Sequence, residues 1–234
     1  MAQKKLIRFK GIRSFANVLE YPQNMKRQWN NFFKNNNSIV LELACGKGEY
    51  AVELGKMHPQ KNFIGVDVKG NRIWKGAKTA LDADLKNVAF LRTQIEMIAN
   101  YFDRNEVSEI WIIFPDPQLR FSKMKKRLTH PRFLRLYQQI LKPNGSIHLK
   151  TDSSELYHFT KKLIHFYQLN LIDDINDVVN SNKLNNELKI KTHYENLNIS
   201  QSDKIFYLQF RINKDLPLEK DAQLKKLFYE EQVK

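Results

Sequence analysis

The chain has 234 residues, 42% of them hydrophobic, which is enough for one α/β domain with a core and excludes a disordered protein. Lys and Arg number 39 against 25 Asp and Glu, and the resulting net charge of +14 favours a polyanionic partner such as a nucleic acid. No apolar run approaches the roughly 20 residues of a membrane helix, and the basic N-terminus lacks the apolar stretch of a secretory signal. The single cysteine, Cys45, excludes an internal disulfide and a metal site built from cysteines, so a reducing cytoplasm is the simplest location.

The first part of the chain is basic and shows no clear periodicity over residues 1–20, so we expect a flexible arm there. Trp29, Phe32 and Phe33 predict a helix that packs on the domain, and the polar tract 35–37 marks a turn before the first strand. We therefore divide the chain into an N-terminal arm with its packing helix, a main domain, and a charged tail or terminal helix, with the boundaries 1–37, 38–213 and 214–234.

From residue 38 onward, short apolar runs alternate with longer amphipathic ones. Strands are predicted at 38–43, 62–67, 88–91, 109–114 and 146–150. Helices are predicted between them, at 48–57, 70–81, around Phe133–Leu141 before a turn at 142–145, and at 153–167. This alternation predicts βαβ units and a mostly parallel sheet with helices on both faces. Two later runs, 171–179 and 204–212, have no crossover helix between them, so the last strand is predicted to be antiparallel.

A glycine turn follows the first predicted strand, where an open parallel sheet binds its ligands. Gly46 and Gly48 allow the backbone to approach a ligand closely, although an ordinary βα turn would use them too. The turn is one glycine short of the dinucleotide pattern, and Glu42 would repel a pyrophosphate, so a nicotinamide dehydrogenase is a distant alternative. A positively charged cofactor fits better, and S-adenosylmethionine carries both an ammonium and a sulfonium. Asp67 is placed either to bind ribose hydroxyls or to cap the next helix.

Two further segments end predicted strands at the same crevice. Gln94 follows the third strand and is placed to reach an adenine edge through its amide. The sequence Phe-Pro-Asp-Pro at 114–117 puts Asp116 at the tip of the fourth strand, between prolines that restrict the backbone. Such rigid placement suits a catalytic or cofactor-contacting carboxylate, with a turn-initiating Asp as the alternative.

A basic run follows Asp116 directly. Its seven cations lie within sixteen residues: Arg120, Lys123, Lys125, Lys126, Arg127, Arg132 and Arg135. We interpret the run as a surface that binds RNA phosphates, because a solvated helix face would alternate with Asp or Glu. Asp152 ends the fifth strand at the same crevice, and the segment 192–195 lies in a late irregular region.

Together these segments resemble the bacterial tRNA (guanine-N7-)-methyltransferase family, of the class I S-adenosylmethionine-dependent fold, over about residues 38–212. The resemblance rests on Glu-x-x-x-Gly-x-Gly at 42–48, Phe-Pro-Asp-Pro at 114–117, Arg-Leu-Thr-x-Pro-Arg-Phe-Leu at 127–134, Lys-Thr-Asp at 150–152 and Thr-x-Tyr-Glu at 192–195. It implies that the main domain is a Rossmann-like methyltransferase domain with seven strands, the last antiparallel.

The resemblance also implies roles for individual residues. Positions that contact the cofactor in the family are matched by Glu42, Asp67, Gln94 and Asp116, the last of which is also taken as catalytic. Positions that contact the substrate are matched by Arg120, Asp152, Thr192, Tyr194 and Glu195. The sequence departs from the family at three places: Gln118 replaces a usual Trp, Asp67 a commoner Glu and Ala44 a commoner Gly. These departures affect the contacts to RNA rather than the reaction.

The implied reaction is methyl transfer from S-adenosylmethionine to N7 of a guanine in the tRNA variable loop, without a metal. N7 carries a free lone pair, so alignment rather than a general base is the main requirement. Asp116 would stabilise the charge that moves onto the purine, and Asp152 or Glu195 would accept from the guanine edge. We expect a monomer, with a homodimer as the alternative. Two rival functions are a class I methyltransferase acting on another RNA, a protein or a small molecule, and an RNA-binding protein that does not catalyse.

Overall fold

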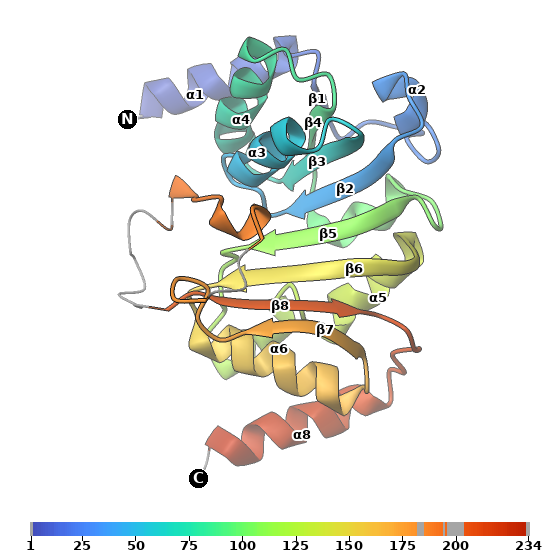
Figure 1. Cartoon of the computed structure of the whole chain (residues 1–234), viewed down its shortest axis with the longest axis vertical. Coiled ribbons are helices and arrows are strands. Elements are labelled where there is room, and N and C mark those ends of the chain that lie inside the picture. Colours follow the sequence, from blue (N-terminus) through green and yellow to red (C-terminus); the bar gives the residue numbers. More distant parts are fainter. Residues whose placement is uncertain (1, 182–184, 194, 196–203, 233–234) are drawn as a thin grey trace.

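The computed structural model describes residues 2–181, 185–193, 195 and 204–232. These residues contain one sheet of eight strands in the order β1-β4-β3-β2-β5-β6-β8-β7 (Figure 1). The strand bounds are β1 Val18–Glu20, β2 Ser38–Leu43, β3 Lys61–Asp67, β4 Val88–Arg92, β5 Val107–Ile113, β6 Leu141–Thr151, β7 Asn170–Ile175 and β8 Phe206–Arg211. All neighbours from β1 to β6 pair in parallel, and β8 is antiparallel to both β6 and β7.

Helices cover both faces of this sheet. The α-helices are α1 Ala2–Gly11, α2 Trp29–Phe33, α3 Glu49–Met57, α4 Gly70–Asp82, α5 Pro131–Ile140, α6 Ser154–Phe166 and α8 Lys220–Gln232. Short 3-10 helices span Ile12–Ser14, Ile95–Asn100, Phe121–Lys126 and Glu187–Lys189. No helix among these described residues is both long and apolar enough to cross a membrane.

Alternating strand residues divide the core into two clusters, one on each face. In β2, Leu41 and Leu43 join the side chains of α2, α5, α6 and α8, whereas Val40 joins those of α3 and α4. Because successive strand residues point to opposite faces, each apolar strand is buried on both sides. This explains why the strands read as continuous apolar runs in the sequence.

The predicted α/β class, the predicted main-domain strands and the antiparallel last strand are confirmed. The sheet, however, has eight strands in the described part of the chain rather than seven. The additional strand is β1, which pairs Val18 with Phe90 at the edge beside β4. Three residues are too few to show a periodic pattern, so this strand was not predicted.

The N-terminal region is therefore structured rather than a flexible arm. Helix α1 packs on α4, and the side-chain amide of Asn17 donates to the carbonyl of Ala77, 3.0 Å away. The expected packing helix is α2, in which Trp29 is fully buried and its indole N–H donates to the carbonyl of Tyr101 at 2.9 Å. Residues 2–37 thus belong to the same sheet and core as the main domain.

The C-terminal segment forms the expected terminal helix, α8. It is anchored by buried Leu224 and by an ion pair of 2.6 Å between Asp221 and Arg135. Strand β6 also begins earlier than expected, at Leu141, which pairs with Val107 before the register shifts and Ser146 pairs with Glu109. The turn signal at 142–145 marks this irregularity.

Candidate active site

A groove of about 480 Å³ lies where the carboxyl ends of β2, β3, β5 and β6 meet, the edge toward which their arrows point in Figure 1. Its lining brings together six of the residues that the sequence singled out: Glu42, Gly46, Asp67, Asp116, Asp152 and Thr192. These residues come from four strand ends and one later segment, which only the parallel sheet makes neighbours.

The glycine turn has an unusual backbone that shapes one wall of this groove. Ala44, Gly46 and Gly48 have φ angles of 55°, 56° and 68°, in the left-handed region that glycine adopts without strain. A Cβ at Gly48 would lie 2.3 Å from Cε1 of Phe90, so glycine is required there for packing as well. The commoner family glycine at position 44 is explained by the same left-handed conformation.

Asp67 connects this turn to the end of β3. Its carboxylate accepts a hydrogen bond of 2.9 Å from the backbone N–H of Gly46 and one of 2.8 Å from the N–H of Lys69. The first residue of α4 is Gly70, and its N-cap is Lys69 rather than Asp67. Asp67 therefore stabilises the two backbone segments that frame the groove while it remains in the groove lining.

Glu42 is buried at the bottom of the groove. Its carboxylate accepts a hydrogen bond of 2.8 Å from the N–H of Ala51, in the first turn of α3. Burial, together with the nearby charges of Glu49 and Asp67, raises the pKa of Glu42 to about 8. Burial also raises the pKa of the Cys45 thiol, which therefore stays neutral. A cation bound in the groove would stabilise the ionised form of Glu42.

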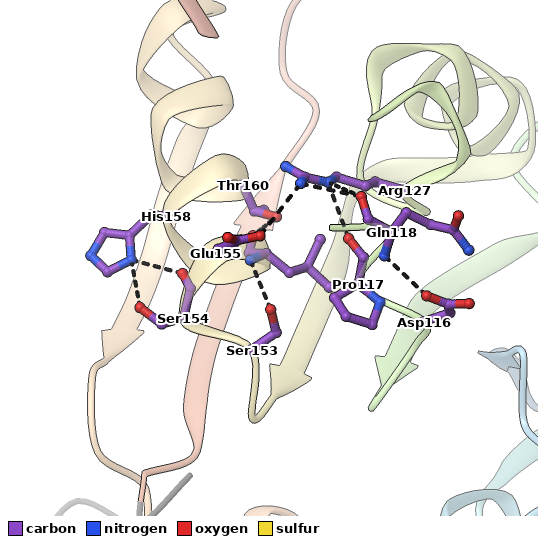
Figure 2. A network of polar contacts seen from close by, with 10 residues as sticks. Asp116, Pro117, Gln118, Arg127, Ser153, Ser154, Glu155, His158 and Thr160 are labelled. Carbon is purple, nitrogen blue, oxygen red and sulfur yellow. Dashed lines mark hydrogen bonds and ion pairs between the residues drawn. The ribbon is translucent and has the colours of Figure 1, made fainter. Parts of the chain in front are cut away.

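The loop that carries Asp116 is strained on both sides. Phe114 and Gln118 have φ angles of 44° and 48°, which non-glycine residues rarely adopt. The Asp116 carboxylate is exposed to the groove and accepts a hydrogen bond of 3.0 Å from the N–H of Gln118 (Figure 2). Such outliers persist where surrounding contacts hold them, and they cluster at functional sites.

Arg127 supplies those surrounding contacts. Its guanidinium donates to the carbonyls of Pro117 and Gln118 at 3.1 and 3.3 Å and lies 4.0 Å from the carboxylate of Glu155 in α6 (Figure 2). The same guanidinium lies over the ring of Phe159. The Arg127 side chain is only 8% exposed, which disfavours the predicted contact with RNA phosphates. It instead fixes the carboxyl side of the Asp116 loop against α6.

The remaining cations of the basic run divide into two groups. Arg120, Lys123, Lys125 and Lys126 are exposed on and just before the 3-10 helix Phe121–Lys126, which is anchored by buried Met124. Arg132 and Arg135, in contrast, are paired with Glu96 and Asp221. The first group is exposed and forms no ion pair among the described residues, whereas Arg135 is largely buried in its pair with Asp221.

A buried lysine holds the late segment that borders the groove. Lys150, at the end of β6, is fully buried and donates to the carbonyls of Leu188 and Ile190 at 3.1 and 3.0 Å and to the carboxylate of Glu195 at 3.1 Å. Burial lowers the pKa of Lys150, and Glu195 opposes that effect. Lys150 belongs to the Lys-Thr-Asp motif at 150–152, but we predicted no role for it, although a lysine inside an otherwise apolar strand was a visible signal.

Thr192 and Glu195 form a reciprocal hydrogen-bonded pair. The N–H of Glu195 donates to the Thr192 hydroxyl at 3.1 Å, and the N–H of Thr192 donates to the Glu195 carboxylate at 3.4 Å. This is the capping box that Thr-x-x-Glu forms at the start of a helix. Thr192 therefore lines the groove, whereas Glu195 is directed toward Lys150 and is absent from the lining.

The structure places the other predicted residues outside the groove lining. Gln94 and Arg120 are exposed, and each immediately precedes a 3-10 helix. Gly48 lines a neighbouring cavity instead, and Tyr194 lies outside the described residues. Within the described part of the chain, no group of three or more His, Cys, Asp or Glu side chains is placed to hold a metal ion.

Solved structures with a similar fold define the class of protein to which this chain belongs. The fold is that of the class I methyltransferases: it is similar to the 16S rRNA methyltransferase KamB, at a TM-score of 0.60 and 16% identity over 80% of this chain and 94% of that one. It is also similar to an S-adenosylmethionine-dependent methyltransferase from Aquifex aeolicus, at a TM-score of 0.51 and 14% identity over 79% and 87%. A family model described as a putative methyltransferase matches residues 36–208.

Sequence relatives define the family. A tRNA (guanine-N(7)-)-methyltransferase of Christiangramia forsetii is 46% identical over 90% of this chain and 99% of its own length. Another, from Bacteroides thetaiotaomicron, is 46% identical over 91% of this chain and 87% of its own length. The chain therefore belongs to the tRNA (guanine-N7-)-methyltransferase family, as its sequence resemblance implied.

Proposed function

We propose that this chain transfers a methyl group from S-adenosylmethionine to N7 of a guanine in tRNA, and by family resemblance the guanine lies in the variable loop. The proposal rests on one observation above all: Asp116 is held on a strained loop at the mouth of a groove whose floor carries buried carboxylates. Family membership supports the substrate and the reaction.

The groove residues fit S-adenosylmethionine chemically. Glu49 and Asp67 lie close enough to Glu42 for their charges to raise its pKa, and this cluster of carboxylates suits a ligand with a sulfonium and an ammonium. Asp67 still has oxygen lone pairs for ribose hydroxyls, since each carboxylate oxygen can accept a second hydrogen bond. We propose Glu42, Gly46, Asp67 and Asp116 as cofactor-binding residues, with Gln94 added from the family match and Gly48 from the glycine turn.

The cofactor, when bound, supplies an electrophilic methyl group. The protein must then hold guanine N7 in line with it, and alignment of this kind contributes much of the rate enhancement. Asp116 is placed to stabilise the positive charge that the purine gains. Asp152 and Thr192 line the same groove and are proposed to bind the guanine edge, while Glu195 acts by holding Thr192 in place.

The exposed cations Arg120, Lys123, Lys125 and Lys126 are proposed to bind tRNA phosphates beside Asp116. The target base is normally stacked within folded tRNA, so local opening must accompany binding. We further propose that the protein acts in the cytoplasm and as a monomer. Light scattering during size-exclusion chromatography would check the oligomeric state.

The direct test is to incubate the purified protein with S-adenosylmethionine and unmodified tRNA, digest the RNA to nucleosides, and look for 7-methylguanosine by mass spectrometry. We expect this nucleoside with the native protein and its loss with Asp116→Ala. A different methylated nucleoside would reassign the target. Cofactor binding without any methylated RNA would favour a protein or small-molecule substrate, and RNA binding without cofactor binding would favour a non-catalytic role.

A further inference from the structure

A second cavity, of about 540 Å³, adjoins the candidate active site. It is lined by the glycine turn and α3, by α4, and by the 3-10 helix Glu187–Lys189 with the residues on either side of it. Glu49 lines both this cavity and the groove, so the two share a wall. We call it the lysine cavity, after Lys47, Lys75, Lys189 and Lys191 in its lining.

The positive charge in the lysine cavity is not neutralised by the protein. Among the described residues, Lys47, Lys75 and Lys191 form no ion pair, and the ammonium of Lys189 donates only to the Asn186 amide oxygen at 3.2 Å. The cavity also contains the carboxylates of Glu49 and Glu53, but Glu53 is paired with Lys56 at 2.7 Å. Four lysines therefore face one unpaired carboxylate.

The pKa of Lys47 reflects this excess of positive charge in the cavity. Burial lowers the pKa of Lys47, and the nearby charges of Lys75, Arg8 and Arg72 lower it further against the opposing charge of Glu49. An anion placed among these cations would relieve their mutual repulsion. The cavity is thus electrostatically prepared for a ligand of opposite charge.

The cavity walls are also fixed by packing. A Cβ at Gly76 would lie 2.4 Å from the carbonyl oxygen of Lys47, which shows how closely α4 approaches the glycine turn. On the other side, buried Lys150 holds the carbonyl of Ile190 at 3.0 Å. Ile190 and Lys191 line the lysine cavity, and the next residue, Thr192, lines the groove. A single anchored segment therefore separates the two sites.

We propose that the lysine cavity binds backbone phosphates of the RNA strand that carries the target guanine. This inference rests on the proposed function, since it extends the RNA site from the groove into the adjoining lysine cavity. A phosphodiester strand leaving the groove past Thr192 meets Lys191 first. No described lining residue is aromatic, so the cavity is suited to the backbone rather than to a stacked base.

The test measures RNA affinity rather than catalysis. Fluorescently labelled, unmodified tRNA is titrated with the native protein and with Lys75→Gln/Lys191→Gln at several salt concentrations. Each phosphate contact adds roughly 0.9 to the slope of log affinity against log salt. We expect the double variant to bind about tenfold more weakly near 0.1 M salt, with a slope shallower by about one to two. The matched control is Lys78→Gln, because Lys78 lies on the same helix but is paired with Asp82 and does not line the cavity.

The outcomes separate this inference from the proposed function. Failure of the native protein to form 7-methylguanosine would refute the function, while loss of affinity in the double variant alone would still assign an RNA site. Equal affinity and salt slope in the native protein, the double variant and the control would refute the inference. Thermal stabilisation by inorganic phosphate in the native protein but not in the double variant, without any change in tRNA affinity, would assign the cavity to a free anion instead.

Discussion

Lys150 and Glu195 form an ion pair in which the ammonium is fully buried and lies 3.1 Å from the carboxylate. They are 45 residues apart in the sequence, and their contact joins the end of β6 to the segment that carries Thr192. The same ammonium also satisfies two backbone carbonyls of that segment. The pair therefore holds one wall of the groove in place.

Replacing Lys150 with Met should destabilise the fold by about 3 kcal/mol, because two carbonyls and a carboxylate lose their donor. We also expect kcat/KM for tRNA to fall, because the segment that carries Thr192 would be displaced from the wall of the groove. Urea unfolding followed by circular dichroism gives the change in stability. The double variant Lys150→Met/Glu195→Gln should recover part of the loss, and equal stability of native protein and single variant would contradict the assigned role.

Stability should depend on pH through Glu42. Its folded pKa of about 8 lies above the unfolded value of 4.5, so the folded state holds an additional proton between these values. The contribution of Glu42 to the free energy of unfolding should therefore be largest below pH 4.5 and should be lost as pH rises through 8. Between these two pH values the slope should approach about 1.4 kcal/mol per pH unit.

Denaturant unfolding at several pH values, without cofactor, measures this slope. Glu42→Gln should flatten the profile between about pH 5 and 8, because the amide does not titrate. A cationic cofactor should bind more tightly as pH rises through the same range, which isothermal calorimetry would detect. Identical profiles for the native protein and Glu42→Gln would show that Glu42 titrates normally.

Arg127 should act on turnover rather than on RNA affinity. Arg127→Leu frees the carbonyls of Pro117 and Gln118, so the strained loop can relax and Asp116 can move. We expect kcat to fall by about tenfold to a hundredfold, since small misplacements at a reacting centre have effects of this size. Steady-state kinetics with tRNA as the varied substrate would separate kcat from KM.

Two neighbouring variants control for this assignment. Arg127→Lys keeps a donor for one carbonyl and should recover part of kcat. Lys126→Gln removes an exposed cation of the same run and should raise KM for tRNA with little change in kcat. If Arg127→Leu raised KM only, Arg127 would be a phosphate ligand after all.

Gly48 should tolerate no side chain. Gly48→Ala combines a positive φ of 68° with a Cβ placed 2.3 Å from Phe90, and overpacking of this kind costs about 1–3 kcal/mol in addition to the backbone strain. Thermal unfolding should show a clear loss of stability. Gly48→Ala/Phe90→Leu removes the clash but keeps the strain, so its stability should lie above that of the single variant.

The sequence by itself determined the α/β class, the positions of the main-domain strands along the chain and the groove residues Glu42, Gly46, Asp67, Asp116 and Asp152. This was possible because apolar runs mark buried strands, and residues after parallel strands must gather at one edge of the sheet. Strand β1 was not predictable, since its three residues are ordered only by pairing with β4.

Only the tertiary structure decided what the charged side chains do. Arg127 and the exposed Lys126 are adjacent in the same basic run, yet one is buried against Phe159 and the other faces solvent. Glu195 points to Lys150 although it shares a motif with groove-lining Thr192. A sequence pattern gives the position of a charge along the chain, but its partner is set by burial and by contacts between segments far apart. The role of a charged residue therefore follows from packing, because a buried charge must be paired while an exposed one is free to bind a ligand.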